Sequence, residues 1–384
     1  MQLNKVSEVN ATRVLQKIWL SDGTTRGAIA SELGLVKSTV SRIVTMLLDQ
    51  GIVLEREDRP TNDGVGRRSV PVEINKEYGI ILGLEIQTDF FDAVAINLRG
   101  EIVGTWSDRL SMGGKDVATA FREIMARLKD PIAACRVPLI GVGVGVAGVV
   151  DQHSGSIVQS NPLNITTPVR FIDDIRDDVP VPVIVENDAN CCCWGELAFR
   201  KTSRHNNFLF VLGEFRAGEA QTDLYWGIAI GLGLVLNGTV YHGAAYSAGE
   251  FQSILWKPGN EGQLSITNEE ASRIKSDKSV MEKALQELCA HLAFLVNSLN
   301  LTAVVFGGEI IEYRDDLLPM LRGEIQRNWS YPNEVVCAIE FSSLSRHAVS
   351  YGAAGMFLES VFSIPEMFST SGPTKRSQIS ILRD

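Results

Sequence analysis

The sequence predicts an α/β protein with an N-terminal winged helix-turn-helix followed by a larger α/β body. Three observations support this fold class. Two short helix patterns joined by a glycine precede a hairpin with a basic tip, strand patterns begin at Tyr78, and three Gly-rich segments each end an apolar strand. The 384 residues, 45% of them hydrophobic and 21% charged, are enough for two to three globular domains.

Three helices are expected in the first 75 residues. Asn10 to Leu20 has an apolar stripe at helical spacing, and Thr25 can N-cap a second helix over Arg26 to Leu33. Gly34 supplies a tight left-handed turn, and a third helix follows from Lys37 to about Gln50. Two helices joined by a Gly turn form a helix-turn-helix, whose second helix can read the major groove.

The third helix has a polar face suited to DNA. Its candidate base and phosphate contacts are Lys37, Ser38, Thr39, Ser41 and Arg42. Residues 52–56 and 67–72 then predict a hairpin wing, whose tip carries Arg67 and Arg68 for phosphate or minor-groove contact. A helical protein-interaction module is the alternative, but three helices, a wing and paired arginines favour DNA.

From Tyr78 the pattern changes to strands and helices in the order of an α/β body. The expected strands cover 80–86, 90–96, 101–106, 139–148, 181–185, 227–238 and 304–308, and the expected helices cover 117–128 and 280–299. Glycines in the strands around 141–148, 227–238 and 307–308 indicate close approach of backbone to a ligand or to neighbouring backbone.

Charge, hydropathy and cysteine usage limit the function classes. Residues 1–75 hold 10 basic and 9 acidic residues, whereas the remainder holds 26 and 37, so a near-neutral DNA reader precedes an acidic body. No apolar run is long enough to span a bilayer, and no secretory signal pattern begins the chain. Cys191, Cys192 and Cys193 are consecutive, which suits neither disulfides nor a metal knuckle. We therefore expect a cytoplasmic protein with no membrane partner.

The order of motifs resembles the ROK family of repressors, open reading frames and sugar kinases. The motifs are GVGVGVAGVVD, VENDAN, GLGLVLNGTVYHG followed by AGE, FGG, and Tyr351-Gly352-Ala353-Ala354, over residues from about 8 to 362. The winged head indicates the repressor branch, of the xylose-repressor type. The resemblance implies a two-lobe, actin-like, sugar-kinase-type body with a sugar cleft between the lobes, in a homodimer or homotetramer.

The family's kinases cradle ATP phosphates with an Asp-x-Gly-Gly-Thr hairpin, and this chain departs from it. The matching stretch runs from Glu85 to Asp89, with Gln87 and Thr88 in place of the glycines and Asp89 in place of the Thr. An anion beside a phosphate is repulsive. We therefore expect no phosphoryl transfer, no catalytic residue and no cofactor.

The resemblance implies that part of the sugar cleft is retained. Asn187 and Asp188 match the pair that holds sugar hydroxyls, and Glu250 matches a second hydroxyl-binding carboxylate; Asp188 could at the same time be a helix N-cap. Ser253 replaces the family's His, and residues 256–265 lack every Cys of its zinc loop, with Ser265 in place of a sugar-binding Glu. We expect no metal site.

The sequence thus supports a sugar-responsive repressor of carbohydrate-utilisation genes that binds a double-stranded operator. The expected domains are a winged helix-turn-helix over 1–77, a two-lobe body over 78–362 and a polar tail over 363–384. Two alternatives stay open: an active sugar kinase with an accessory head, and a ligand-independent DNA-binding dimer, which the losses at Ser253 and Ser265 favour.

Overall fold

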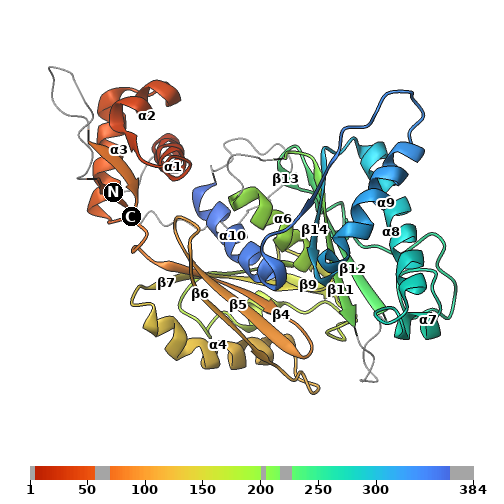
Figure 1. The fold of residues 1–384 in the computed structure, drawn as a ribbon. Coiled ribbons are helices and arrows are strands. Elements are labelled where there is room, and N and C mark those ends of the chain that lie inside the picture. The colour runs from red at the N-terminus through yellow and green to blue at the C-terminus, as the bar shows by residue number, and fades with distance from the viewer. Residues whose placement is uncertain (1–4, 57–69, 200–204, 217–226, 364–384) are drawn as a thin grey trace.

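The computed structural model describes residues 5–56, 70–199, 205–216 and 227–363. The predicted α/β fold class is confirmed: a small N-terminal head, defined as the described residues before Tyr78, precedes a larger body (Figure 1). The tip of the predicted wing, including Arg67 and Arg68, lies outside the described residues, as does nearly all of the predicted tail.

The head is a winged helix-turn-helix. Its elements are α1 (Lys5–Trp19), β1 (Thr24–Thr25), α2 (Arg26–Leu33), α3 (Lys37–Asp49), β2 (Val53–Glu55) and β3 (Pro71–Ile74), and the strands form an antiparallel sheet in the order β1-β3-β2. Helix α1 begins at Lys5, five residues before the predicted start at Asn10. The prediction began the helix too late because residues 5–9 have no apolar stripe to signal a helix.

Local side-chain chemistry sets the helix ends in the head. The hydroxyl of Thr25 accepts a hydrogen bond from the Ala28 N–H at 3.2 Å, which caps α2 as predicted. Gly34 ends that helix in the left-handed region at φ 64°, where glycine has no steric cost. The apolar stripe of α3 is buried in the head, so its opposite face is presented to solvent; the buried residues are Val40, Ile43, Val44 and Leu47.

The first lobe of the body is built on a mixed five-stranded sheet in the order β10-β7-β4-β5-β6. Its elements are β4 (Ile80–Ile86), β5 (Phe90–Asn97), β6 (Ile102–Arg109), α4 (Val117–Ala134), β7 (Leu139–Val146), β8 (Val149–Asp151), β9 (Ser156–Gln159), α5 (Phe171–Asp174) and β10 (Val183–Asn187). The antiparallel hairpins β4-β5 and β5-β6 confirm the three strands expected after Tyr78. Helix α4 covers one face of the sheet (Figure 1).

The second lobe has a five-stranded sheet in the order β13-β12-β11-β14-β15. Its elements are β11 (Phe208–Arg216), β12 (Gly227–Leu236), β13 (Thr239–Val240), α7 (Asn268–Ser272), α8 (Lys278–Leu299), β14 (Ala303–Gly308), the 3-10 helix η1 (Glu309–Tyr313), α9 (Arg314–Arg327) and β15 (Ala338–Phe341). Helices α8 and α9 lie on its outer side (Figure 1).

Two helices, α6 (Asp188–Phe199) and α10 (Ala348–Phe362), lie between the sheets of the two lobes (Figure 1); the short 3-10 helix η2 (Ser345–His347) leads into α10. A Cβ on Gly352 of α10 would lie 1.9 Å from the carbonyl oxygen of Cys191 in α6, so only glycine permits this backbone contact. Cys191, Cys192 and Cys193 are buried filler of this layer, as their small size suggests.

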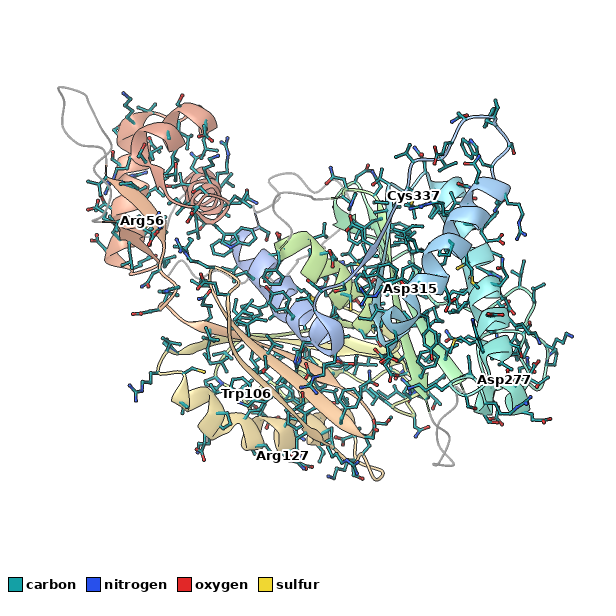
Figure 2. The ribbon with its side chains drawn as sticks, viewed as in Figure 1. Arg56, Trp106, Arg127, Asp277, Asp315 and Cys337 are labelled. Carbon is teal, nitrogen blue, oxygen red and sulfur yellow. The ribbon has the colours of Figure 1, made fainter. Side chains whose placement is uncertain are left out.

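The head is fixed to the body through α10 and the β5–β6 turn. Trp19 at the end of α1 stacks on Phe362 at the end of α10, with ring centroids 4.6 Å apart and an interplanar angle of 10°. Arg99 of the body binds Glu73 of the head at 2.9 Å, and Arg56, labelled in Figure 2, binds the same carboxylate at 3.3 Å. The described parts of the head and the body therefore share one apolar core.

Candidate functional site

The first candidate site is the solvent face of α3. Lys37, Ser38, Ser41 and Arg42 are exposed and Thr39 is half-buried, so the structure brings the five predicted α3 residues onto one turn-and-a-half of helix. This is the part of a recognition helix that enters the major groove. Arg42 donates to Ser7 of α1 at 3.5 Å, a long contact at an exposed position.

Val36 is a residue of this face that the sequence reasoning missed. It lies directly before α3 and is 70% exposed. No side chain caps the helix there; the N–H groups of Thr39 and Val40 donate to the Val36 carbonyl at 3.0 and 3.2 Å, and the two N–H groups before them, of Lys37 and Ser38, lie where a phosphate oxygen could approach. An exposed aliphatic side chain at this position can contact a thymine methyl group. From the sequence, an apolar residue between two helices is expected to be buried in the core, so the exposure of Val36 was not predicted.

The second candidate site is a cleft of about 320 Å³ between the lobes. Asn187, Asp188 and Glu250, predicted as the sugar-binding set, all line it. The end of β10 and the start of α6 position the first two, and the loop after β13 positions Glu250. Gly249, at φ 91°, allows this loop to lie against β12, because a Cβ there would be 1.9 Å from the Leu232 carbonyl oxygen.

The N-cap of α6 is Asn187, whereas the sequence suggested Asp188 for this role. The amide oxygen of Asn187 accepts from the Asn190 N–H at 3.0 Å, so Asn187 caps α6 and Asp188 is the first helical residue. The Asn187 amide nitrogen also donates to the Gly148 carbonyl at 3.0 Å. The Asp188 carboxylate accepts from its neighbouring Ala189 N–H at 2.8 Å.

The carboxyl groups of the cleft have raised pKa values. Burial raises the pKa of Asp188 to about 6, with a further contribution from Glu250. Burial raises the pKa of Glu250 as well. Carboxylates that are poorly solvated and close to one another gain from hydroxyl donors, and a polyol supplies such donors.

The cleft includes residues that the sequence reasoning did not assign to ligand binding. Gln87, Glu214, Arg216 and Gln263 line it beside the predicted set. Gln87 lies in the turn between β4 and β5. The positions of Glu214, Arg216 and Gln263 depend on the packing of β11 and β12 against α6 and on the loop after β13, which a linear pattern does not predict.

Gln87 occupies the hairpin that holds phosphate in the family's kinases. Its side chain is 7% exposed and donates to the buried carboxyl group of Glu85 at 2.8 Å. Its N–H donates to the Phe90 carbonyl at 3.0 Å within the hairpin. Burial holds the pKa of Glu85 well above its usual range. The side chains of Gln87 and Glu85 therefore bind each other within this hairpin.

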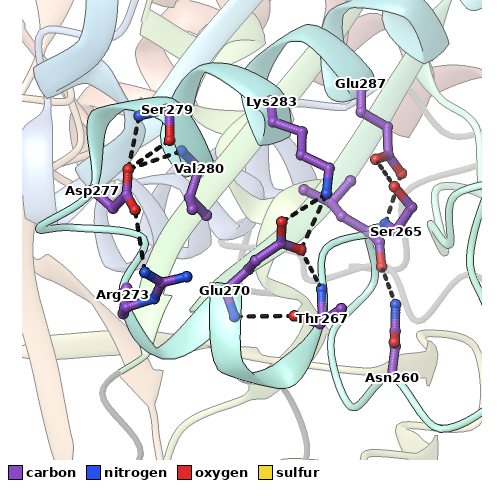
Figure 3. A network of polar contacts seen from close by, with 11 residues as sticks. Asn260, Ser265, Thr267, Glu270, Arg273, Asp277, Ser279, Val280, Lys283 and Glu287 are labelled. Carbon is purple, nitrogen blue, oxygen red and sulfur yellow. Dashed lines mark hydrogen bonds and ion pairs between the residues drawn. The ribbon is translucent and has the colours of Figure 1, made fainter.

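Residues 253–265, where the family has its zinc loop, are fastened by side-chain hydrogen bonds. Gln263 accepts from the Ile230 N–H at 2.7 Å and donates to the carbonyls of Ile230 and Phe251, each at 2.8 Å. The Ser265 N–H donates to Glu287 at 2.9 Å (Figure 3). In the part of the chain that the structure describes, no cluster of three His, Cys, Asp or Glu side chains is arranged for a metal ion.

These features together define a sugar-kinase-type, two-lobe body that carries a winged helix-turn-helix head. Residues 81–263 match the model of the ROK family, so the chain carries a ROK family domain, as the motif order predicted. Of the helices in the described ranges, none is both long and apolar enough to cross a membrane.

Relatives of known name extend over nearly the whole chain. The chain is 24% identical to the xylose repressor of Caldicellulosiruptor bescii, over 94% of this chain and 98% of that protein. It is also 24% identical to the xylose repressor of Bacillus subtilis, over 83% of this chain and 87% of that protein.

Solved structures share the fold. A ROK family transcriptional regulator, described as a homologue of the Escherichia coli Mlc protein, superposes with a TM-score of 0.71 at 18% identity, over 92% of this chain and 96% of that chain. A ROK family glucokinase from Streptomyces griseus, bound to glucose and AMPPNP, superposes with a TM-score of 0.54 at 20% identity, over 72% and 99%.

Proposed function

We propose that this protein is a DNA-binding transcriptional repressor that responds to a sugar. The observation that carries the proposal is the exposed polar face of α3 on a head that is packed onto a body with a carboxylate-lined cleft. Relatives over most of the chain are named xylose repressors, which supports the same function.

In this proposal α3 reads the major groove of a double-stranded operator. Lys37, Ser38, Thr39, Ser41 and Arg42 contact bases and phosphates, and Arg67 and Arg68 of the wing contact phosphates. A homodimer presents two such helices to half-sites of a pseudo-palindromic operator.

The cleft would hold the sugar effector through Asn187, Asp188 and Glu250. Asp188 begins α6, and α6 contacts α10 backbone to backbone at Cys191 and Gly352. Helix α10 ends at Phe362, against Trp19 of the head. A sugar that moves one lobe relative to the other therefore acts on the layer that supports the head, which is a structural basis for release from DNA.

We further propose that the body is not an enzyme. Gln87 and Glu85 satisfy each other in the hairpin where phosphate would bind, which argues against nucleotide binding. One observation favours the alternative of a sugar kinase: the pKa of Asp188, at about 6, suits a general base. ATP turnover with D-glucose and D-xylose tests this alternative. We expect no turnover above that of an Asp188→Asn variant.

The proposed function is tested by selecting operator sequences from a random DNA pool with the full-length protein. We expect an enriched motif of two half-sites and weaker DNA binding when a sugar from a panel that includes D-xylose and D-glucose is added. Reciprocity requires that DNA weakens sugar binding by the same factor. Failure to enrich any motif would reject the DNA-binding function.

A further inference from the structure

The lining of the cleft carries more acidic than basic side chains. Among the described residues, the ionisable side chains of the lining are those of Asp188, Glu214, Glu250 and Arg216, three carboxyl groups against one guanidinium. A fourth carboxyl group, that of Glu85, is buried behind Gln87 and interacts electrostatically with both Glu214 and Asp188. A ligand in this cleft meets a surplus of negative charge.

Glu214 is positioned by the strand ends of the second lobe. It lies near the end of β11, where the neighbouring Gly213 pairs with Gly308 of β14. A Cβ on Gly308 would lie 2.4 Å from the Oε1 atom of Glu214, so glycine at this position leaves room for the carboxylate. Gly308 has φ 76°, which also favours glycine there.

The acidic neighbour of Glu214 has its own partners. Glu309 of η1 accepts from the Phe215 N–H at 2.7 Å and from Lys275 at 3.0 Å. The Glu214 carboxyl group accepts a backbone hydrogen bond from Glu309 and lines the cleft, where Arg216 is the basic residue of the described lining. Burial, with contributions from Glu309 and Asp188, raises the pKa of Glu214 to about 7, and Arg216 acts in the opposite direction.

An anionic ligand and an uncharged ligand therefore meet this cleft differently. A phosphate ester brings a dianion into a partly desolvated space that already holds several carboxyl groups, and the Arg216 charge is offset by Glu214 and Asp188. An uncharged sugar brings only hydroxyl groups, which donate to these carboxylates without adding charge.

We propose that Glu214 is a specificity-determining residue that makes the cleft select uncharged sugars and reject their phosphate esters. This inference rests on the proposed function and names the class of effector for the same cleft. Glu214 discriminates between ligands by charge. Its repulsion of an anionic ligand is as important for specificity as the attractive contacts of Asp188 and Glu250 with a sugar.

The test is calorimetric titration of the full-length protein at pH 8 with two matched pairs: D-glucose against D-glucose 6-phosphate, and D-xylose against D-xylose 5-phosphate. We expect the wild type to bind an uncharged sugar more tightly than its ester. Glu214→Gln keeps the shape of the side chain and removes its charge, so the ester should bind roughly tenfold more tightly while the parent sugar changes little. Glu261→Gln, an exposed acidic position outside the cleft lining, is the matched control and should leave both affinities unchanged.

Three outcomes overturn the inference. If the wild type binds an ester as tightly as its parent sugar and the ester releases DNA, the inference alone fails and the proposed function stands. If Glu214→Gln leaves the ratio of the two affinities unchanged, discrimination does not depend on Glu214. If no sugar or ester binds while the protein still binds its selected DNA, the inference fails together with the sugar-responsive part of the proposed function.

Discussion

The face of α3 and the interlobe cleft place their polar side chains in opposite surroundings. Lys37, Ser38 and Arg42 project from a helix into solvent. The carboxyl groups of Asp188 and Glu214 lie in a cleft whose desolvation raises their pKa values to about 6 and about 7. One surface suits a polyanion with a condensed layer of counterions, and the other suits a small ligand that replaces water.

Because the surroundings differ, a different solution condition should control each interaction. Binding to exposed cations releases counterions and should depend steeply on salt. Binding to partly buried carboxylates is screened little by salt, but it should depend on pH because the carboxylates must be ionised to accept charge-assisted hydrogen bonds. Variants of the two sites should therefore respond to different solution conditions.

The largest effect is expected at the cleft, from Asp188→Asn. The variant keeps the shape and one acceptor oxygen but removes the charge, so each sugar hydrogen bond changes from charge-assisted to neutral. The loss should be roughly tenfold in affinity per bond, or about a hundredfold for two bonds. Calorimetry with the responsive sugar measures it, and DNA affinity without sugar should stay near wild type.

The control is Asp315→Asn, an exposed position of α9 labelled in Figure 2. It should leave sugar affinity unchanged. If Asp188→Asn and Glu250→Gln both leave sugar affinity and sugar-induced release unaffected, the effector binds elsewhere or does not exist. The body would then serve as a dimerisation scaffold for a ligand-independent DNA-binding protein.

The wing arginines should dominate the salt dependence. Arg67→Ala combined with Arg68→Ala should weaken binding to all DNA sequences alike. Each lost phosphate contact should lower the log–log salt slope by about 0.9, so the pair should lower it by about 1.8. Titrations at several salt concentrations measure the slope, and sugar affinity should not change. An unchanged slope would mean that the wing does not touch phosphates.

Ser38, Thr39 and Arg42 should give a different signature from the wing. They lie on the solvent side of α3, so their replacement should relax base preference at single operator positions. Loss of a good bidentate base contact costs about 1–3 kcal/mol at the contacted position. Repeating the operator selection with each variant measures this, and recovery of the wild-type motif would contradict the assignment.

Sequence patterns predicted the helices of the head and the succession of strands along the chain well, because both depend on local signals. Thr25 and Gly34 have capping preferences that act within one turn of helix. Thr25 begins α2 and Gly34 ends it at the expected positions. The cleft residues were predicted only where a short motif marks them, at Asn187, Asp188 and Glu250. Glu214, Arg216 and Gln263 reach it through strand pairing and loop closure over longer distances, which no periodicity reports.

Gln263 should matter for the stability of the second lobe. Its amide holds the backbone of Ile230 and Phe251 through three hydrogen bonds, in the loop where relatives with thiolates would bind zinc. Gln263→Ala leaves these groups without their partner, so we expect the free energy of unfolding to fall by about 1–3 kcal/mol. Denaturant unfolding measures it. Added zinc should not restore stability, and elemental analysis showing one zinc per wild-type chain would contradict the expected absence of a metal site.

The smallest effect is the pH dependence of the cleft. Because the pKa of Asp188 is about 6, its ionised fraction falls from nearly complete at pH 7.5 to about a quarter at pH 5.5, and sugar affinity should fall by about fourfold.

The stability of the unliganded protein should change in the opposite direction. A raised carboxyl pKa means that the folded state binds more protons than the unfolded state between about pH 4 and 7, so lowering the pH through this window adds stability. Calorimetric titrations and thermal unfolding at both pH values separate the two trends, since Asp188→Asn should lose both the Asp188 part of the affinity change and part of the stability gain. Affinity that rises as the pH falls would show that the neutral carboxyl group, and not the carboxylate, holds the sugar.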